Sequence, residues 1–327
     1  MAERKKATIK DVAKEANVSI SVVSYVLNQS TEKTISDGTR DRVMQAVRKL
    51  NYVANRAASG MRRGKSLAIG VVSYWELDVM VFTNMLRGIS ETALDSDYRV
   101  VLSHQKSGED NSAYLNYFLD GTIDGIIFIA PYESLGLIDE AAHIKGMKQA
   151  GAPFVIVNGS SREDGVSYIN IDFYGSTYLA TSYLIGEGHT DIAYVAPSFH
   201  YAELMQRYEG YRDAMHKHGL PENVRDIAAL PQYITKLKAA VANKSDTAHL
   251  IMEEALKQGV SIPGDLPLIA ANTEAYSAYL FPPLSTVRIP AEEMGALAAE
   301  TLLKQIRGEP AAAVTTLPCT LEIRKSC

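Results

Sequence analysis

Four side chains within five residues, Ser21, Val22, Ser24 and Tyr25, combine two hydroxyl groups, a branched methyl surface and a phenol ring. Such hydroxyl groups can exchange hydrogen bonds with base edges, and methyl groups can contact the thymine methyl in the major groove of DNA. The same small polar side chains also occur on ordinary surface helices. The segment therefore suits the recognition of base pairs, and the charge around it must decide between the two interpretations.

Charge is distributed unevenly along the 327 residues. Residues 1–66 contain fourteen Lys and Arg against six Asp and Glu, a net charge of +8, whereas the rest of the chain carries −13. A cationic segment is attracted to the phosphate backbone of nucleic acid, and an acidic body is repelled from it. This asymmetry favours a DNA-binding head over the alternative, a merely solvated basic tail.

Apolar residues in this head repeat at the spacing of a helix face. Thr8 and Asp11 form a capping-box-like start of a helix over 8–15, and Ser19 and Ser36 are expected to cap two more helices around the loop 28–35. The expected core positions of the three helices are Ile9, Val12, Ala13, Ala16, Val22, Val23, Val26, Leu27, Val43, Val47 and Leu50. The spacing predicts a small all-α helix-turn-helix head.

Beyond the head, apolar strand-like runs alternate with helical stretches. The runs are SLAIGVVS, YRVVLSHQ, IDGIIFIA, PFVIVNG, VSYINID, DIAYVAP and LPLIAAN, with helices expected at 80–96, 109–120, 139–150, 174–187 and 203–218. This alternation predicts an α/β body with doubly wound parallel sheets, and its length fits two lobes. Ligands of such sheets bind at the carboxyl ends of strands, which here meet in the cleft between the lobes.

No combination of residues in the sequence supplies catalytic machinery. The glycine-rich nucleotide motifs, the nucleophile elbow and the HExxH zinc motif are absent. His104, His143 and His189 are isolated, and His216 and His218 face apart on an expected helix. We therefore expect no catalytic residue, no metal site and no cofactor, and an α/β sugar-processing enzyme is only a remote alternative.

The termini and the cysteines indicate a compartment. The N-terminal MAERKKATIKDV lacks an apolar signal region, no uninterrupted apolar stretch of about 18 residues occurs, and Cys319 and Cys327 lack a metal-binding spacing. These features predict a cytoplasmic, nucleoid-associated protein without a membrane partner. They also exclude a secreted solute-binding protein.

Two segments, TIKDVAKEANVSISVVSYVLN and TRDRVMQAVRKLNYVANRAA, closely resemble the head of the LacI/GalR family of bacterial transcription regulators. The resemblance implies a second helix in the major groove and a hinge helix in the minor groove. The positions that match the family's DNA contacts are Thr8, Ser19, Ile20, Ser21, Val22, Ser24, Tyr25, Asn28, Tyr52, Asn55, Arg56, Ala58, Met61 and Arg62.

Two of these positions depart from the family pattern. Tyr25 stands where an Arg is usual, so the bidentate contact of Arg to guanine is lost and a different half-site sequence is expected. Met61 stands where the family usually inserts a Leu into the minor groove, and it keeps an apolar but more flexible wedge.

Residues 51–65, NYVANRAASGMRRGK, are expected to form the hinge. The segment is basic and Ala-rich, but it is too short to hold a helix alone in water, and Gly60 weakens it further. Folding of the hinge only on the operator would couple the body to DNA. An ordinary flexible linker is the alternative.

The body resembles the family's periplasmic-binding-protein-like sensor through RGISETA, IDGIIFIAP, NIDFYGSTYLATSYLIGEGHTDIAYVAP, RYEGYRDAM and PPLSTVRIPAEEMGALAAETLL. The resemblance implies three parts: a DNA-binding domain over 1–50, a hinge over 51–65 and an effector-binding and dimerisation domain over 66–327. It further implies a homodimer that binds a pseudo-palindromic operator on double-stranded DNA. A small-molecule effector in the cleft would modulate this repressor.

The cleft departs from the family's sugar-binding pattern. Its usual carboxylates are replaced at Asn158, at Asn243-Lys244 and at Asn272, and the stretch between Ile227 and Asn243 is too short for a strand and a helix. A simple neutral hexose is thus a less suitable effector than in a typical member. The candidate effector contacts are Tyr74, Trp75, Val79, Tyr132, Asn158, Asp172, Arg207, Asn243 and Asn272.

Two interpretations of these residues stay open. Arg207 can clamp a carboxylate or phosphate, as in a sugar phosphate or another anion, while Trp75 and the tyrosines stack on a planar or sugar face. Alternatively, Arg207 is a structural ion-pair partner and the aromatics pack between the lobes. A degenerate pocket would leave control to a protein partner.

Overall fold

The chain forms two compact units, residues 1–66 and 67–327, in a computed structural model. The structure describes residues 7–27, 35–52, 65–75, 77, 79–105, 112–130, 138–159, 161–198, 202–311 and 313–327. The first unit is called the head and the second the body.

The head contains three helices, α1 (Ile9–Glu15), α2 (Ile20–Leu27) and α3 (Asp37–Lys49). Thr8 caps α1 as expected, because its backbone N–H and hydroxyl both donate to Asp11 and its hydroxyl accepts from the Asp11 N–H. The shared core consists of Val12, Ala13, Ala16, Val23, Val26, Val43 and Ala46. The predicted helix-turn-helix head is confirmed.

The turn between α1 and α2 depends on Asn17. This residue has a φ of 51°, in the left-handed region that Asn tolerates better than most residues. Val18 then donates its N–H to the Ala13 carbonyl, and the Ser19 hydroxyl accepts from the Val22 N–H at 3.3 Å. The chain therefore reverses direction within four residues and starts α2 with a side-chain cap.

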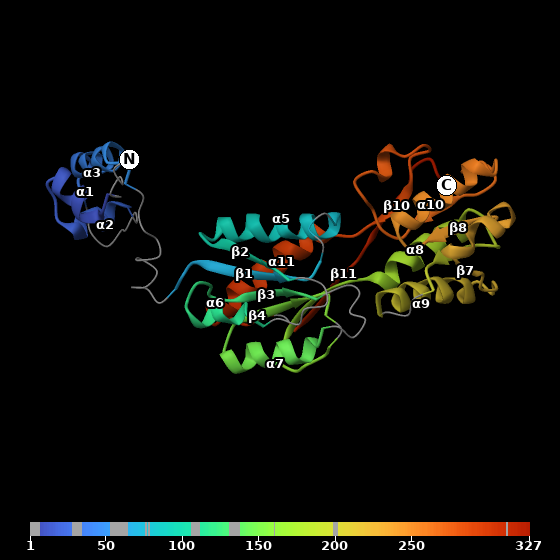
Figure 1. Cartoon of the computed structure of the whole chain (residues 1–327), viewed down its shortest axis with the longest axis horizontal. Helices are drawn as coiled ribbons and strands as arrows, with labels where there is room; N and C mark the ends of the chain where they lie inside the picture. The colour runs from blue at the N-terminus through green and yellow to red at the C-terminus, as the bar shows by residue number, and fades with distance from the viewer. Residues whose placement is uncertain are drawn as a thin grey trace. The chain divides into compact units, whose positions relative to one another are not determined.

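The first lobe of the body is built on a six-stranded sheet in which all described neighbours are parallel. In sheet order its strands are β11 (Val314–Leu317), β5 (Ser167–Ile171), β4 (Phe154–Val157), β3 (Ile126–Ile129), β1 (Ala68–Ser73) and β2 (Arg99–His104). Helices α5 (Met80–Asp95) and α11 (Ala291–Ile306) pack on one face, and α6 (Leu115–Leu119) and α7 (Glu140–Ala150) on the other. Figure 1 shows α5 and α7 on opposite sides of this sheet.

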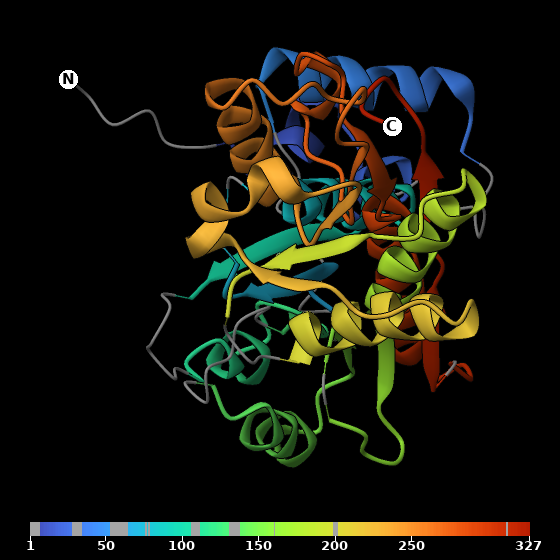
Figure 2. The same cartoon turned by 90° about the vertical axis from the view of Figure 1, so that its right-hand side faces the viewer.

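The second lobe has its own six-stranded sheet. In sheet order its strands are β12 (Thr320–Glu322), β10 (Ser285–Arg288), β9 (Leu268–Ala270), β8 (Ala240–Ala242), β6 (Ala193–Ala196) and β7 (Val224–Asp226). Helices α8 (Phe173–Gly186) and α9 (Ala202–Lys217) cover one face and α10 (Ser245–Lys257) the other. In Figure 2 the strands pass between α9 and α10.

The chain passes between the lobes three times: between β5 and α8, between β10 and α11, and between β11 and β12. The C-terminal segment therefore adds a strand to each sheet. Three covalent connections side by side form the pivot about which two such lobes can open and close.

The predicted α/β fold class is confirmed, with local differences. The helix expected at 109–120 is described only as α6, Leu115–Leu119. One strand departs from the predicted parallel sheets: β12 runs antiparallel to β10, because the chain enters the sheet from the opposite end after leaving β11. The short stretch after Ile227 holds two 3₁₀ turns, η1 (Ile227–Gln232) and η2 (Ile234–Lys236), in place of a helix.

Helices α5 and α11 approach each other closely through two glycines. A Cβ atom on Gly88 would lie 2.0 Å from the Glu292 carbonyl oxygen, and one on Gly295 would lie 2.0 Å from the Met85 carbonyl oxygen. Only the absence of both side chains permits this contact between the two helix backbones. The Gly of the RGISETA segment thus has a packing role.

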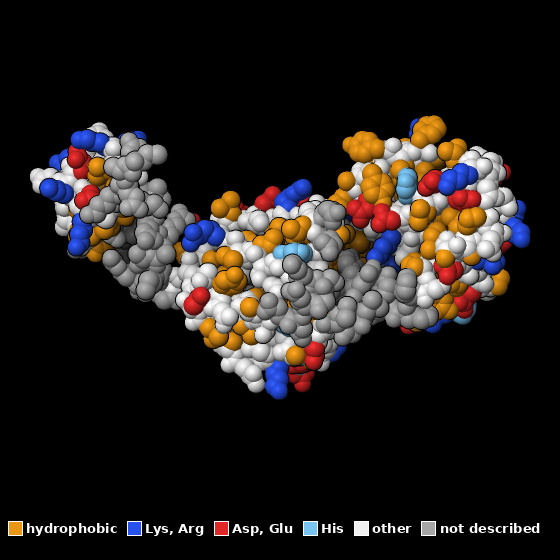
Figure 3. All heavy atoms as spheres, viewed as in Figure 1, with side chains coloured by type: hydrophobic (Ala, Val, Ile, Leu, Met, Phe, Trp, Pro, Cys, Tyr) orange, Lys and Arg blue, Asp and Glu red, His pale blue; other side chains and the backbone are white. Residues whose placement is uncertain are grey.

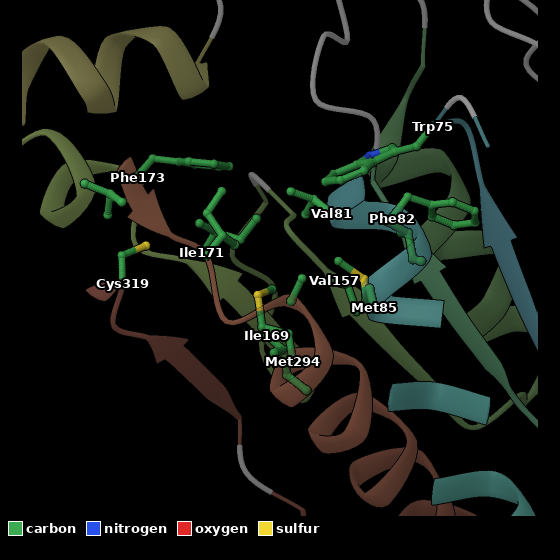
Figure 4. Close-up of a cluster of buried hydrophobic side chains, with 14 of the residues drawn as sticks. Trp75, Val81, Phe82, Met85, Val157, Ile169, Ile171, Phe173, Met294 and Cys319 are labelled. Carbon is green, nitrogen blue, oxygen red and sulfur yellow. The ribbon is translucent and has the colours of Figure 1, made fainter. Parts of the chain in front are cut away.

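The core of the first lobe continues to the edge of the second. Met85 of α5 and Met294 of α11 pack over Val157 and Ile169 of the sheet, as Figure 4 shows. Phe173, the first residue of α8, belongs to the same buried cluster. The hydrophobic core is therefore continuous from one lobe to the other.

Candidate functional sites

Helix α2 presents a polar outer face opposite its buried residues. Val23 and Val26 face the head core, whereas Ser19, Ile20 and Ser21 are exposed. The other expected DNA contacts on this helix, Val22, Ser24 and Tyr25, are half-exposed. The fold thus brings six of the expected contacts together along the start and one side of a single helix.

Two further expected contacts have local structural roles. Thr8 caps α1. Tyr52 is partly buried against the head core, and its N–H donates to the Val47 carbonyl. The expected contacts Asn28, Asn55, Arg56, Ala58, Met61 and Arg62 lie outside the described residues. The hinge expected at 51–65 is likewise described only at its ends.

The other two helices of the head carry basic side chains. Lys10 and Lys14 lie on α1, and Arg40, Arg42 and Arg48 lie on α3. Lys49 forms an ion pair of 2.7 Å with Glu15, which joins α3 to α1. Exposed cations beside a helix with small polar side chains supply the phosphate contacts that orient a protein on duplex DNA.

In the body, most of the expected effector contacts follow the carboxyl ends of strands. Trp75 follows β1, Asn158 follows β4, and Asp172 follows β5 in the first lobe; Asn243 follows β8 and Asn272 follows β9 in the second. Val79 caps α5, and Tyr132 lies outside the described residues. This arrangement matches the ligand-binding edge of parallel α/β sheets.

Tyr74 differs from the other expected contacts because its side chain lies in the core of the first lobe. Its hydroxyl is 3.2 Å from Nε2 of His143, whose Nδ1 is 3.0 Å from the Tyr114 hydroxyl. All three side chains are buried beside Phe128. Tyr74 and the isolated-looking His143 thus form a polar link inside the core.

Trp75 is buried, and a hydrogen bond fixes its orientation. Its indole Nε1–H donates to the Ala130 carbonyl at 2.6 Å, so the ring is tied to the end of β3. Figure 4 shows Trp75 and Phe173 pointing toward one another from the two lobes. Phe173 was not among the expected contacts, although it follows the expected contact Asp172 directly.

Arg207 of α9 lies inside the second lobe and is almost completely buried. Its Nη1 donates to the Ser176 hydroxyl at 3.2 Å and to the Ala271 carbonyl at 2.6 Å, and its guanidinium lies 4.9 Å from the centre of the Phe173 ring. Arg207 therefore joins α8, α9 and the end of β9. This arrangement supports a structural role for Arg207.

We expect Arg207→Met to lower the free energy of unfolding by about 2–4 kcal/mol, because two buried acceptors lose their donor. Urea unfolding would measure this change. Arg212→Met is the matched control, since Arg212 lies on the same helix, is partly exposed and pairs with its neighbour Asp213; a change within about 0.5 kcal/mol is expected there. Equal stability of both variants would contradict the structural role.

The remaining expected effector contacts stabilise the loops that carry them. Asp172 accepts from the Gly175 N–H at 2.7 Å and caps α8, and Asn243 accepts from the Thr247 hydroxyl at 2.6 Å. Asn158 has a φ of 58°. The Asn272 side chain accepts from the Ser245 N–H at 2.6 Å and donates to Glu274 at 3.2 Å.

Glu274 is a carboxylate of this edge that the sequence analysis missed. Burial, followed by the nearby Asp246 carboxylate, raises its pKa to about 7, while Lys244 and the hydrogen bond from Asn272 act in the opposite direction. The signal available in the sequence was its position, two residues after Asn272, in a segment otherwise poor in charge.

A groove of about 560 Å³ lies on the body outside these contacts. It follows α5 and the start of α11 and reaches Thr273, Arg288 and Glu322 of the second lobe. None of the expected effector contacts lines it.

Among the described residues, no three or more His, Cys, Asp or Glu side chains are grouped to hold a metal ion. No helix in the described ranges is long and apolar enough to cross a bilayer.

Two family models match the chain. "Bacterial regulatory proteins, lacI family" matches residues 8–55, and "Periplasmic binding protein-like domain" matches residues 181–327, so that together they cover more than half of the chain.

Curated relatives match over almost the full length. Catabolite control protein A of Priestia megaterium is 26% identical over 336 residues, which cover 98% of each chain. The HTH-type transcriptional repressor PurR of Vibrio campbellii is 28% identical over 318 residues, which cover 92% of each chain.

Solved structures have the same fold. The Lac repressor dimer bound to operator and the anti-inducer ONPF aligns with a TM-score of 0.80 at 23% identity and covers 98% of this chain and 99% of that chain. The complex of the transcriptional regulator CelR with cellobiose aligns with a TM-score of 0.67 at 23% identity and covers 98% and 100%.

Proposed function

We propose, since the chain belongs to the LacI family of bacterial regulatory proteins, that it is a transcription regulator that represses genes by binding operator DNA as a homodimer. The observation that carries the proposal is the outer face of α2, where Ser21 is exposed and Ser24 and Tyr25 are half-exposed, in a head that carries basic side chains on its other two helices. A helix of this kind is the element that enters the major groove in helix-turn-helix proteins.

The cleft of the body binds a small-molecule effector. The support is the set of polar and aromatic residues that follow the strand ends, together with two similar solved structures, CelR in complex with cellobiose and the Lac repressor dimer bound to ONPF. Because Arg207 is engaged inside the second lobe, an anion bound through this residue is disfavoured. The effector is accordingly bound by groups of the cleft other than the Arg207 guanidinium.

An exposed apolar patch supplies the contact between two copies. The aromatic face, defined as Leu250, Tyr276, Tyr279 and Phe281, lies on α10 and the loop before β10. Phe281 is 96% exposed and Tyr279 88%. Figure 3 shows hydrophobic side chains gathered over this part of the second lobe. A patch of this kind on a soluble chain marks an interaction site, and a two-fold axis lets the same face serve both copies.

The operator can be identified directly. The full-length protein is incubated with sheared genomic DNA of its source at about 0.15 M salt, where non-specific binding is weak, and the retained fragments are sequenced. We expect a two-fold symmetric motif. Val23→Asp serves as control because it places a charge in the head core and leaves the body sequence unchanged. If the wild type retains no motif, or if Val23→Asp retains the same motif as the wild type, the proposal that this head binds an operator is contradicted.

Tyr25 reads bases rather than phosphates. Tyr25→Ala is expected to reduce discrimination between the operator and single-base variants of one half-site by about 1–3 kcal/mol, with little change on non-specific DNA. Fluorescence anisotropy on a panel of operator variants measures both quantities. Arg40→Ala is the comparison, since a lost phosphate contact weakens binding to all sequences alike. If Tyr25→Ala lowers the affinity equally for every DNA sequence, Tyr25 does not contact bases.

The relatives are regulators rather than enzymes, and a non-catalytic role is proposed for this chain as well. The site of action that follows from operator binding is the bacterial nucleoid in the cytoplasm. Control by a protein partner in place of a small molecule is the second candidate, and the replacement of a helix by two short turns between Ile227 and Asn243 favours it.

A further inference from the structure

A chain of hydrogen bonds connects the cleft to the aromatic face. Asn272, at the end of β9, binds the Ser245 N–H through its amide oxygen and Glu274 through its amide nitrogen. The Glu274 N–H donates to the Ser277 hydroxyl at 3.1 Å, and that hydroxyl is 3.3 Å from the Ser245 hydroxyl. The loop 272–277 and the start of α10 are thus held by one polar network.

The network ends at the aromatic face. Tyr276 donates its hydroxyl to Asp246 at the start of α10 and lies edge-on to His249, with ring centres 6.3 Å apart. Tyr279 and Phe281 follow a few residues later, and the Leu284 N–H donates to the Ser277 carbonyl, which closes the loop. Any change at Glu274 is therefore transmitted through a short, bonded loop to the surface proposed to contact a second copy.

Glu274 is half-buried, and none of the ion pairs formed by the described residues includes it. The charged and titratable groups around it are Asp246, Lys244 and His249 from the α10 side and Tyr276 from its own loop. Asp246 opposes its ionisation and Lys244 favours it. A second copy seated on the aromatic face would remove water from both carboxylates and penalise two adjacent negative charges more strongly.

We propose that Glu274 is a proton-binding residue that links the cleft to the dimer contact, so that association of two copies takes up protons at Glu274. The inference rests on the proposed homodimer face. It makes self-association tighter as the pH falls from 8 to 6. Since Glu274 also fixes the Asn272 amide, an effector that contacts Asn272 acts on the same loop.

The sign follows from linkage. The pKa of Glu274 is raised in the monomer and is expected to be raised further in the dimer. Between these two pKa values, the dimer therefore binds more protons than two monomers do. The dissociation constant therefore increases with pH across this interval, with a slope of up to two protons per dimer, one from each copy. Above and below the interval the slope returns to zero.

Analytical ultracentrifugation of the full chain between pH 6 and pH 8 measures this dependence. We expect the wild-type dissociation constant to rise about tenfold over this range. Glu274→Gln keeps the shape and the hydrogen-bonding capacity but cannot ionise, so its dissociation constant is expected to be independent of pH. Asp246→Asn removes a charge that raises the pKa of Glu274, so the rise in the dissociation constant is expected to begin at a lower pH than in the wild type.

Two control variants separate Glu274 from its neighbours. Glu253→Gln on α10 removes an exposed carboxylate that pairs with Lys257 and is expected to retain the wild-type slope. His249→Gln removes the imidazole ring that lies edge-on to Tyr276, and it is also expected to retain the slope.

Failure of the inference and failure of the dimer face give different results. If Phe281→Asp leaves association unchanged, the proposed dimer face is wrong and the inference falls with it. If Phe281→Asp abolishes association but Glu274→Gln keeps the wild-type slope, or the wild type has no slope, only the proton linkage is overturned. Loss of the slope in His249→Gln alone would assign the proton to the histidine and equally overturn it.

Discussion

Gly88→Ala and Gly295→Ala are each expected to lower the free energy of unfolding of the body by about 2 kcal/mol or more, although alanine favours a helix by about 1 kcal/mol over glycine. The added methyl group would lie 2.0 Å from a carbonyl oxygen of the facing helix, so α5 and α11 must separate. Backbone atoms cannot move aside as the end of a flexible side chain can. The packing of the first lobe would therefore loosen along the whole contact.

Urea unfolding followed by far-UV circular dichroism measures this loss. Gly186→Ala is the matched control, because Gly186 ends a helix of the same body and a Cβ atom there meets nothing within 4 Å. It is expected to be neutral or slightly stabilising. If all three variants had wild-type stability, the close approach of α5 and α11 would not contribute to the fold.

Phe281→Asp is expected to convert the homodimer to a monomer and to weaken operator binding by about 100-fold or more, because two linked heads bind far more tightly than one. The substitution places a charge at a side chain that is 96% exposed in the single chain, so its effect on folding should be small. Ultracentrifugation gives the mass, and anisotropy with a labelled operator gives the affinity.

Leu119→Asp provides the control for this second experiment. Leu119 is also an exposed large apolar residue, but it lies on α6 of the first lobe, away from the aromatic face. We expect it to remain dimeric and to bind the operator normally. A dimeric Phe281→Asp variant, or a monomeric Leu119→Asp variant, would move the contact to another surface.

Much of the fold could be predicted because its signals are local. The capping pair Thr8 and Asp11, the apolar spacing of α2 and the seven apolar runs are all recorded within a few residues, and each produced the expected element. Strands β7, β8 and β10–β12 were not among the expected runs. Three of them have only three residues each, which is too short for a periodic pattern, and they are strands because the sheet extends to them.

The cleft was less predictable because neighbours distant in sequence determine what a side chain does. Arg207 was a candidate anion clamp by position, yet Ser176 and Ala271, 31 and 64 residues away, engage it inside the second lobe. Tyr74 and Trp75 are adjacent in sequence, but strand alternation sends them to opposite faces of the sheet, into different core clusters. Their burial follows from the helices that cover each face.

By itself, the sequence determined the division into a basic head and an acidic α/β body, the helix-turn-helix pattern and the strand-helix alternation, because charge and periodicity belong to the chain whatever its packing. Tertiary structure alone decided which groups at the strand ends are engaged in hydrogen bonds, which are buried and which are exposed. The pairing of Asn272 with Ser245 and Glu274, the raised pKa of Glu274 and the exposure of Phe281 all depend on burial and on contacts between separate segments. Desolvation and long-range neighbours are properties of the folded chain, and no spacing of residues encodes them directly.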